Sequence, residues 1–160
     1  NQAVRQAARS KANEDLSDKR KFQFDFWSKF KEKLAKTKKI PSLQTPRPQY
    51  WFDVTLGKSY IHISNTCNTD DNTVGVRIYI GNKIADTMLP FLESKKDEIE
   101  SSIGQKLIWN PNPDNRDKVI ILQHTTDFED ERKLDESLNW LVDYTIKFRE
   151  TFSKIIKQAP

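Results

Sequence analysis

The sequence predicts an α+β domain of two layers, in which an antiparallel sheet of about five strands is covered by helices. Three patterns predict it: an aromatic stripe with a four-residue period near the start, a middle region that alternates apolar and polar residues, and a closing segment with apolar steps of four and three. Short polar connections favour hairpins between the strands. The predicted order of elements is α-β-β-β-α-β-β-α.

The first predicted helix begins after Ser17, whose hydroxyl can cap unpaired N–H groups, and it ends before Pro41. Its apolar stripe consists of Phe22, Phe26, Phe30 and Leu34, with Trp27 beside them. Burial of one large apolar side chain contributes about 1.5–3 kcal/mol. We therefore expect these rings to lie in the core and not to stack on nucleic-acid bases. Phe24 lies off the stripe, where it either extends the covered face or forms a surface that another domain hides.

Three strands are predicted in the middle of the chain, because β-branched and aromatic residues alternate with polar ones. Their sequences are YWFDVTL from Tyr50, SYIHIS from Ser59 and TVGVRIYI from Thr73. Gly57 and Lys58 are expected to form the first tight connection, and the turn formers of residues 65–72 the second.

A second helix is predicted from about Ile84 to Ile103, with Gly104 as a left-handed C-cap and with Pro90 tolerated only in the first turn. KLIWN and KVIILQH then predict two more strands. The last helix has the clearest pattern in the chain. Its apolar positions are Leu134, Leu138, Leu141, Thr145, Phe148, Phe152 and Ile155.

Length and composition indicate one folded domain with a heavily charged surface, since 36% of the 160 residues are hydrophobic and 31% are charged. We predict a basic extension over residues 1–17, partly helical or disordered, and a single domain over residues 18–158. The start at Asn1 leads us to expect a piece of a longer protein with another domain upstream. A lone cysteine and the lack of a long apolar run favour the cytoplasm and no membrane partner.

The net charge of +4 is distributed unevenly. Residues 1–40 hold twelve Lys and Arg against five Asp and Glu, whereas residues 41–160 hold fifteen against eighteen. Such a basic front either binds a polyanion, for which nucleic acid is the candidate, or only solvates a connecting helix. The candidate contacts for a polyanion are Arg5, Arg9, Lys11, Lys19, Arg20, Lys21, Lys31, Lys38 and Lys39.

One face of the first three strands is a candidate recognition surface, provided that the hairpins are regular. It would carry Trp51, Asp53, Tyr60, His62, Arg77 and Tyr79. Aromatic rings and Arg dominate binding hot spots. The same residues equally suit a sheet face that the first helix covers, with Arg77 paired to an acid. Both interpretations stay open, because the sequence does not fix the strand register.

No catalytic, metal-binding or cofactor-binding set is predicted. Glu93–Lys95 matches half of a restriction-type nuclease motif but falls in a helical pattern, whereas that chemistry needs a strand. Cys67, His62 and Asp70 are the residue types of a thiol nucleophile, its base and an acid, but turn formers surround the cysteine. The histidines His62 and His124 lack metal-ligand spacing, and the four glycines form no phosphate-binding loop.

Four segments carry a resemblance to a known family: FDFWSKF, RIYI, FLESKKDEIESSIGQKLIW and ESLNWLVDYTIKFRETF. In order and spacing, they resemble an uncharacterised prokaryotic family of domains of unknown function, over roughly Lys21 to Lys157. That family commonly lies C-terminal to a restriction-endonuclease-like domain. Its third strand often reads Arg-x-Glu, whereas here Ile78 and Tyr79 follow Arg77. The family has no accepted catalytic residues to carry over.

Two hypotheses of function follow. The first is a non-catalytic accessory domain of a larger nucleic-acid-processing or defence protein, serving target contact, autoregulation or assembly. The alternative is a protein-interaction or dimerisation module without nucleic-acid contact, in which the last helix pairs with a copy of itself in a homodimer.

Overall fold

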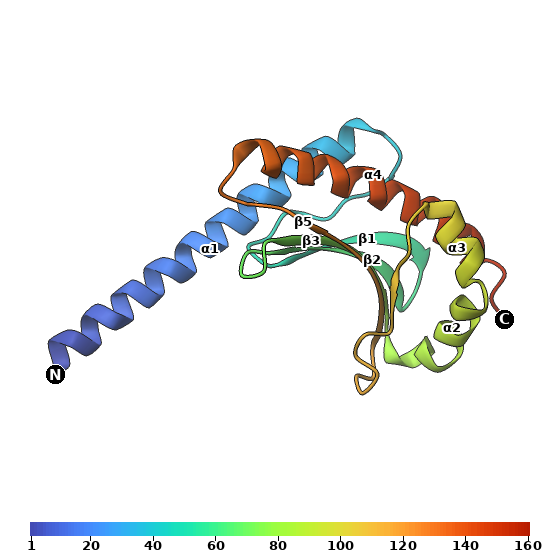
Figure 1. Cartoon of the computed structure of the whole chain (residues 1–160), viewed down its shortest axis with the longest axis horizontal. Helices are drawn as coiled ribbons and strands as arrows, with labels where there is room; N and C mark the ends of the chain where they lie inside the picture. Colours follow the sequence, from blue (N-terminus) through green and yellow to red (C-terminus); the bar gives the residue numbers. More distant parts are fainter.

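The computed structural model describes residues 1–160 and shows a curved sheet with helices packed against one of its faces (Figure 1). The strands are β1 (Trp51–Lys58), β2 (Ile61–Asn68), β3 (Thr73–Ile80), β4 (Ile108–Trp109) and β5 (Lys118–Thr125). They form one antiparallel sheet in the order β1-β2-β3-β5-β4. The helices are α1 (Gln2–Lys36), α2 (Asn82–Ser94), α3 (Lys96–Ile103) and α4 (Glu131–Ile156). The predicted α+β class, the five antiparallel strands and the element order are confirmed.

The aromatic stripe of α1 lies in the core, as predicted. Phe26, Trp27, Phe30 and Leu34 are buried, and Phe22 packs against them. Trp27 also donates a 2.8 Å hydrogen bond from its indole Nε1 to the carbonyl of Gln49, which fixes the segment before β1. Phe24 is 46% exposed and forms no part of this core.

The predicted start of α1 is wrong, because the helix begins at Gln2 with Asn1 as its cap and runs through Ser17. Residues 1–17, which we predicted to be a partly helical or disordered extension, lie almost wholly in this helix. Alanines at positions 3, 7, 8 and 12 have the highest helix propensity, and no Gly or Pro interrupts them. A residue that can cap a helix therefore does not start one when good helix formers precede it. This half of α1 projects away from the sheet (Figure 1).

The predicted turns between the first three strands need correction. Gly57 and Lys58 belong to β1, and Gly57 has a φ of 79° where the register with β2 shifts. Such an irregularity suits a glycine, which adopts positive φ without a steric cost. β2 continues to Asn68, so only residues 69–72 form the second turn. Asn65 is strand and not turn because it is buried, where its amide donates to the carbonyl of Phe52 at 3.3 Å.

The second predicted helix consists of two helices, since the chain breaks at Lys95 between α2 and α3. Pro90 lies in the interior of α2 and not in its first turn as we required. Gly104 ends α3 with a φ of 80°, as predicted. Of the KLIWN segment only Ile108 and Trp109 are strand. The Glu100 carboxylate holds this segment by accepting from the backbone N–H of Leu107 at 2.7 Å and from Trp109 Nε1 at 3.1 Å.

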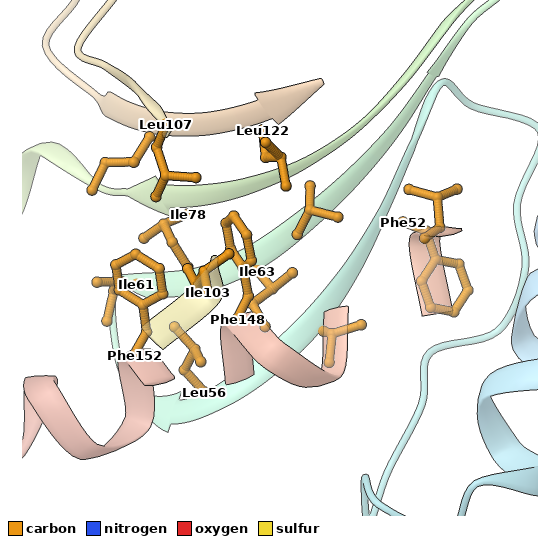
Figure 2. Packing of buried hydrophobic residues seen from close by; sticks show 14 of the residues in the cluster. Phe52, Leu56, Ile61, Ile63, Ile78, Ile103, Leu107, Leu122, Phe148 and Phe152 are labelled. Carbon is orange, nitrogen blue, oxygen red and sulfur yellow. The ribbon is translucent and has the colours of Figure 1, made fainter. Parts of the chain in front are cut away.

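The apolar stripe of α4 packs on the sheet. Phe148 and Phe152 lie beside Ile61, Ile63 and Ile78, as Figure 2 shows, and all are buried. This apolar stripe of α4 is therefore occupied within the chain. None of the four helices combines the length and the apolar character needed to cross a membrane.

Candidate binding face on the uncovered side of the sheet

The register of the first three strands places the candidate residues in rows across the sheet. Asp53 lies opposite Ser64, and Ser64 lies opposite Arg77. His62 lies opposite Thr55 on one side and Tyr79 on the other. Side chains alternate between the two faces of a strand, so these rows lie on the face opposite the buried core positions. We call this side of the sheet the open face.

A hollow of about 290 Å³ lies on the open face. Seven residues line it: Tyr50, Trp51, Asp53, His62, Ser64, Arg77 and Tyr79. Five of the six residues that the sequence singled out therefore surround one concavity. Tyr50 and Ser64 were missed, although Tyr50 is the first residue of the first predicted strand and alternation places Ser64 on the same side of the second as His62.

Arg77 lines the hollow and forms no ion pair within 4.0 Å. Its Nη2 donates a 2.8 Å hydrogen bond to Ser64 Oγ, while its Nε is buried and has no hydrogen-bond partner. Its Cζ lies 5.9 Å from the centre of the Tyr50 ring and 5.7 Å from that of Tyr79. It takes part in none of the ion pairs of the chain. A half-buried guanidinium held by rings and a neutral hydroxyl remains able to bind an acceptor from outside.

Asp53 lies next to His62 at the edge of the same hollow. Its Oδ1 lies 3.5 Å from His62 Nε2 and has no hydrogen-bond partner. Burial raises the pKa of the Asp53 carboxyl, but the neighbouring His62, Ser64 and Arg77 groups outweigh it and hold this pKa below its usual value. Asp53 is therefore ionised at neutral pH and presents a hydrogen-bond acceptor at the hollow.

Tyr79 and His62 form a stacked pair, with ring centres 5.3 Å apart and ring planes at 20°. The Tyr79 hydroxyl donates to Asp117 Oδ2 at 2.6 Å. This hydrogen bond, together with burial, raises the pKa of Tyr79 above its usual value. The ring is thus fixed at one end by a carboxylate and along its face by His62, which makes it a rigid wall for a ligand.

A second hollow of about 430 Å³ continues from the first, because Asp53 and His62 line both. It extends along β1 to Lys58 and Tyr60 and is bordered by Ser42 and Gln44 from the segment before β1. Tyr60, the sixth candidate, is 51% exposed there. The Lys83 ammonium lies 5.0 Å from the centre of its ring. The two hollows together form a groove with exposed rings at both ends, Tyr50 and Tyr60.

The candidate polyanion contacts do not gather on the open face. Arg5, Arg9, Lys11, Arg20 and Lys21 are exposed along the N-terminal part of α1. Lys19 forms an ion pair with Asp70 at 3.4 Å. Lys31 is half-buried near the C-terminal end of α1, and Lys38 and Lys39 follow that helix. These cations are spread along a helix of 35 residues, which spans roughly 50 Å at about 1.5 Å per residue.

The catalytic constellations that we considered do not assemble. Cys67 and His62 are five residues apart on β2, so they lie on opposite faces of the sheet. Burial raises the pKa of the Cys67 thiol to about 12, which keeps it protonated at neutral pH. Glu93–Lys95 lies where α2 ends and not on a strand. No cluster of three or more His, Cys, Asp and Glu side chains suited to a metal ion is found.

Comparison with known families adds one finding. Residues 22–156 match the family described as Domain of unknown function (DUF4268). The matched segment begins at the aromatic stripe of α1 and ends at the last residue of α4, so it contains the whole sheet and the open face. A search of curated proteins finds no match.

Proposed function

The chain belongs to the DUF4268 family, and we propose that it is a non-catalytic accessory domain that binds single-stranded nucleic acid on its open face. The observation that carries this proposal is the groove that runs from Tyr50 to Tyr60, with Arg77, which forms no ion pair, in the lining of its first hollow. Proteins that bind single strands place aromatic rings on an exposed sheet, where bases stack, and add Arg for phosphates or base edges.

The composition of the groove favours a single strand over a duplex. Duplex binding relies on Lys and Arg that neutralise phosphates. The lining of the two hollows contains two cations, Arg77 and Lys58, against one carboxylate, Asp53. Rings therefore outnumber positive charges, and stacking of unpaired bases is the interaction that such a surface offers. Salt should weaken this binding only modestly, since few counterions are released.

The proposed setting is a larger prokaryotic, cytoplasmic protein that processes nucleic acid or acts in defence. The resemblance described above supports this setting, because that family commonly lies next to a restriction-endonuclease-like domain. An accessory domain that holds a single strand would contribute target contact to such a partner domain. The cations of α1, such as Arg5 and Arg9, would then add sequence-independent attraction.

The test is fluorescence anisotropy with labelled single-stranded DNA and RNA of about ten nucleotides, within the range of about 4–16 that one OB-fold binds. Tyr50→Ala and Tyr60→Ala should each weaken binding, because loss of one stacked base costs about 1–3 kcal/mol. Phe24→Ala is the matched control, since Phe24 is an aromatic residue of similar exposure, 46% against 49% for Tyr50, outside the open face. Circular dichroism verifies that each variant is folded.

Two results would overturn the proposal. One is the absence of binding to any single strand at low salt. The other is binding that survives Tyr50→Ala and Tyr60→Ala but is lost when Arg5, Arg9 and Lys11 are changed to Glu, which would assign the contact to α1. In the first case the protein-interaction module becomes the leading hypothesis for the open face, where Ile108 is also exposed, in the same row as Arg77.

A further inference from the structure

A separate hollow of about 240 Å³ lies between the C-terminal part of α4 and the segment that follows α1. It is lined by Lys39, Ile40, Ile146, Arg149, Glu150, Ser153, Lys154 and Lys157. We call it the basic hollow. Four of these side chains are cationic and only one is acidic, so the concavity carries an excess positive charge.

The cations of the basic hollow have no acidic partners in the chain. Lys39, Arg149, Lys154 and Lys157 take part in none of the ion pairs. The negative end of the α4 dipole accounts for Lys154 and Lys157. It does not account for Lys39, which another segment brings to the same concavity. Four cations gathered around a single carboxylate, Glu150, carry an excess of like charge that repels, and a bound anion reduces that repulsion.

Among the four cations of the basic hollow, Arg149 has its side chain held in place by hydrogen bonds. Its Nε donates to the carbonyl of Thr55 at 3.1 Å, and its Nη1 lies 3.5 Å from the carbonyl of Lys39. These contacts tie α4 to β1 and to the segment after α1, so the guanidinium is positioned before any ligand arrives. Nη2 is left without a partner in the chain. A planar donor in this position, next to the Ser153 hydroxyl, suits the oxygens of a phosphate group.

We propose that the basic hollow is a phosphate-binding site. Phosphate matches it because four cationic side chains and the Ser153 hydroxyl line one small hollow, and no flat aromatic ring is present there for a base. Neighbouring residues also connect it to the groove: Thr55, whose carbonyl binds Arg149, lines the second hollow of the open face. A strand that leaves the open face over the edge of β1 would therefore reach this site with a backbone phosphate. Only this route, and not the site itself, rests on the proposed function.

The site is tested by titrating the ¹⁵N-labelled protein with pyrophosphate and following the backbone amides by NMR. Amides of residues 39–40 and 149–157 should shift on binding. Lys154→Gln combined with Lys157→Gln should weaken the affinity about tenfold or more, because hydrogen bonds to charged groups are strong. Lys147→Gln is the matched control on the same helix, since the Lys147 ammonium lies 5.0 Å from the centre of the Tyr144 ring and outside the hollow.

Three outcomes separate the possibilities. No shift with pyrophosphate, or equal weakening by Lys147→Gln, overturns the phosphate site. If the double variant weakens binding of pyrophosphate but not of the single strand, the site is supported and the route is overturned. The natural ligand of the site is then a free phosphate-containing anion and not the backbone of the bound strand. Weakening of both ligands by the double variant supports the site and the route.

Discussion

Tyr79 donates a 2.6 Å hydrogen bond to Asp117, and this contact links the centre of the open face to two other elements. Asp117 directly precedes β5, and its Oδ1 accepts from the backbone N–H of Asn82 at 2.8 Å and from the Asn82 side chain at 3.0 Å. The first residue of α2 and the wall of the groove are therefore held by one carboxylate. A substitution of Asp117 should therefore affect both the stability of the fold and the position of Tyr79 on the open face.

Asp117→Asn should lower the pKa of the Tyr79 hydroxyl toward its usual value of 10.0. The hydrogen bond to the Asp117 carboxylate is the largest cause of the raised pKa, and the negative charge adds to it. The measurement is a pH titration of the protein with ¹³C-labelled tyrosine, followed by NMR. The remaining tyrosines act as internal controls. An unchanged Tyr79 titration in the variant would show that Asp117 does not set this pKa.

The free energy of unfolding should fall in acid because of Asp117 and Glu100. Hydrogen bonds from Tyr79 to Asp117, and from the backbone of Leu107 to Glu100, hold the pKa of each carboxyl below its usual value, 3.8 and 4.5. A pKa that is lower in the folded state gives stability that is complete above the unfolded pKa and is lost as the pH falls through the folded pKa. Denaturant unfolding at a series of pH values between neutral and strongly acidic measures this loss.

The matched variant for that experiment is Asp117→Asn combined with Glu100→Gln. It should be less stable than the original protein at neutral pH, and its stability should depend less on pH in the acid range. Because both side chains are partly exposed, solvent screens part of each effect. If the free energies of unfolding of the original protein and the double variant, plotted against pH, stay parallel down to the lowest pH, the acid sensitivity does not come from these two carboxylates.

Thr145→Val should destabilise the fold by about 1–3 kcal/mol, the cost of leaving a buried polar atom without its hydrogen bond. The Thr145 hydroxyl donates to Asn65 Oδ1 at 2.7 Å, and both residues are fully buried between α4 and β2. Valine has nearly the same shape but leaves the Asn65 oxygen unpaired. Thermal and denaturant unfolding measure the difference. Thr145→Ser keeps the hydroxyl and should retain the Asn65 interaction, so a larger loss in Ser than in Val would contradict this account.

The alternation of apolar and polar residues in a strand predicts on which face of the sheet a side chain lies. It does not predict which residue of the next strand lies beside it. Val74, Val76 and Ile78 lie two residues apart in the predicted strand TVGVRIYI, which indicates one shared side, and all three are buried. That Ser64 would lie between Asp53 and Arg77 depends on pairing with two other strands, which a local pattern does not contain. The grouping of Asp53, Arg77 and Tyr79 on one side was therefore predictable, whereas the bond from Arg77 to Ser64 was not.

Errors in the predicted elements arose where tertiary contacts override local chemistry. Asn65 has turn propensity, yet its hydrogen bonds to Phe52 and Thr145 hold it in a buried strand. Lys154 and Lys157 lie at the end of α4, where local sequence indicates only that their charges complement the helix dipole. Their meeting with Lys39 required knowing that the segment after α1 packs beside α4. Contacts between residues more than a hundred positions apart leave no trace in local periodicity.

Asp53 predicts which bases the groove prefers, and this prediction rests on single-strand binding as proposed. Its carboxylate is ionised at neutral pH and offers only hydrogen-bond acceptors. Cytosine presents an exocyclic amino group with two N–H donors to such an acceptor, whereas the single N3–H donor of an unpaired thymine lies between two carbonyl oxygens that repel a carboxylate. Oligonucleotides of dC should therefore bind several-fold more tightly than dT of equal length. Asp53→Asn offers both a donor and an acceptor, so it should remove this preference while stacking on Tyr50 and Tyr60 keeps binding measurable. Equal affinity of the original protein for dC and dT would show that Asp53 does not contact the bases.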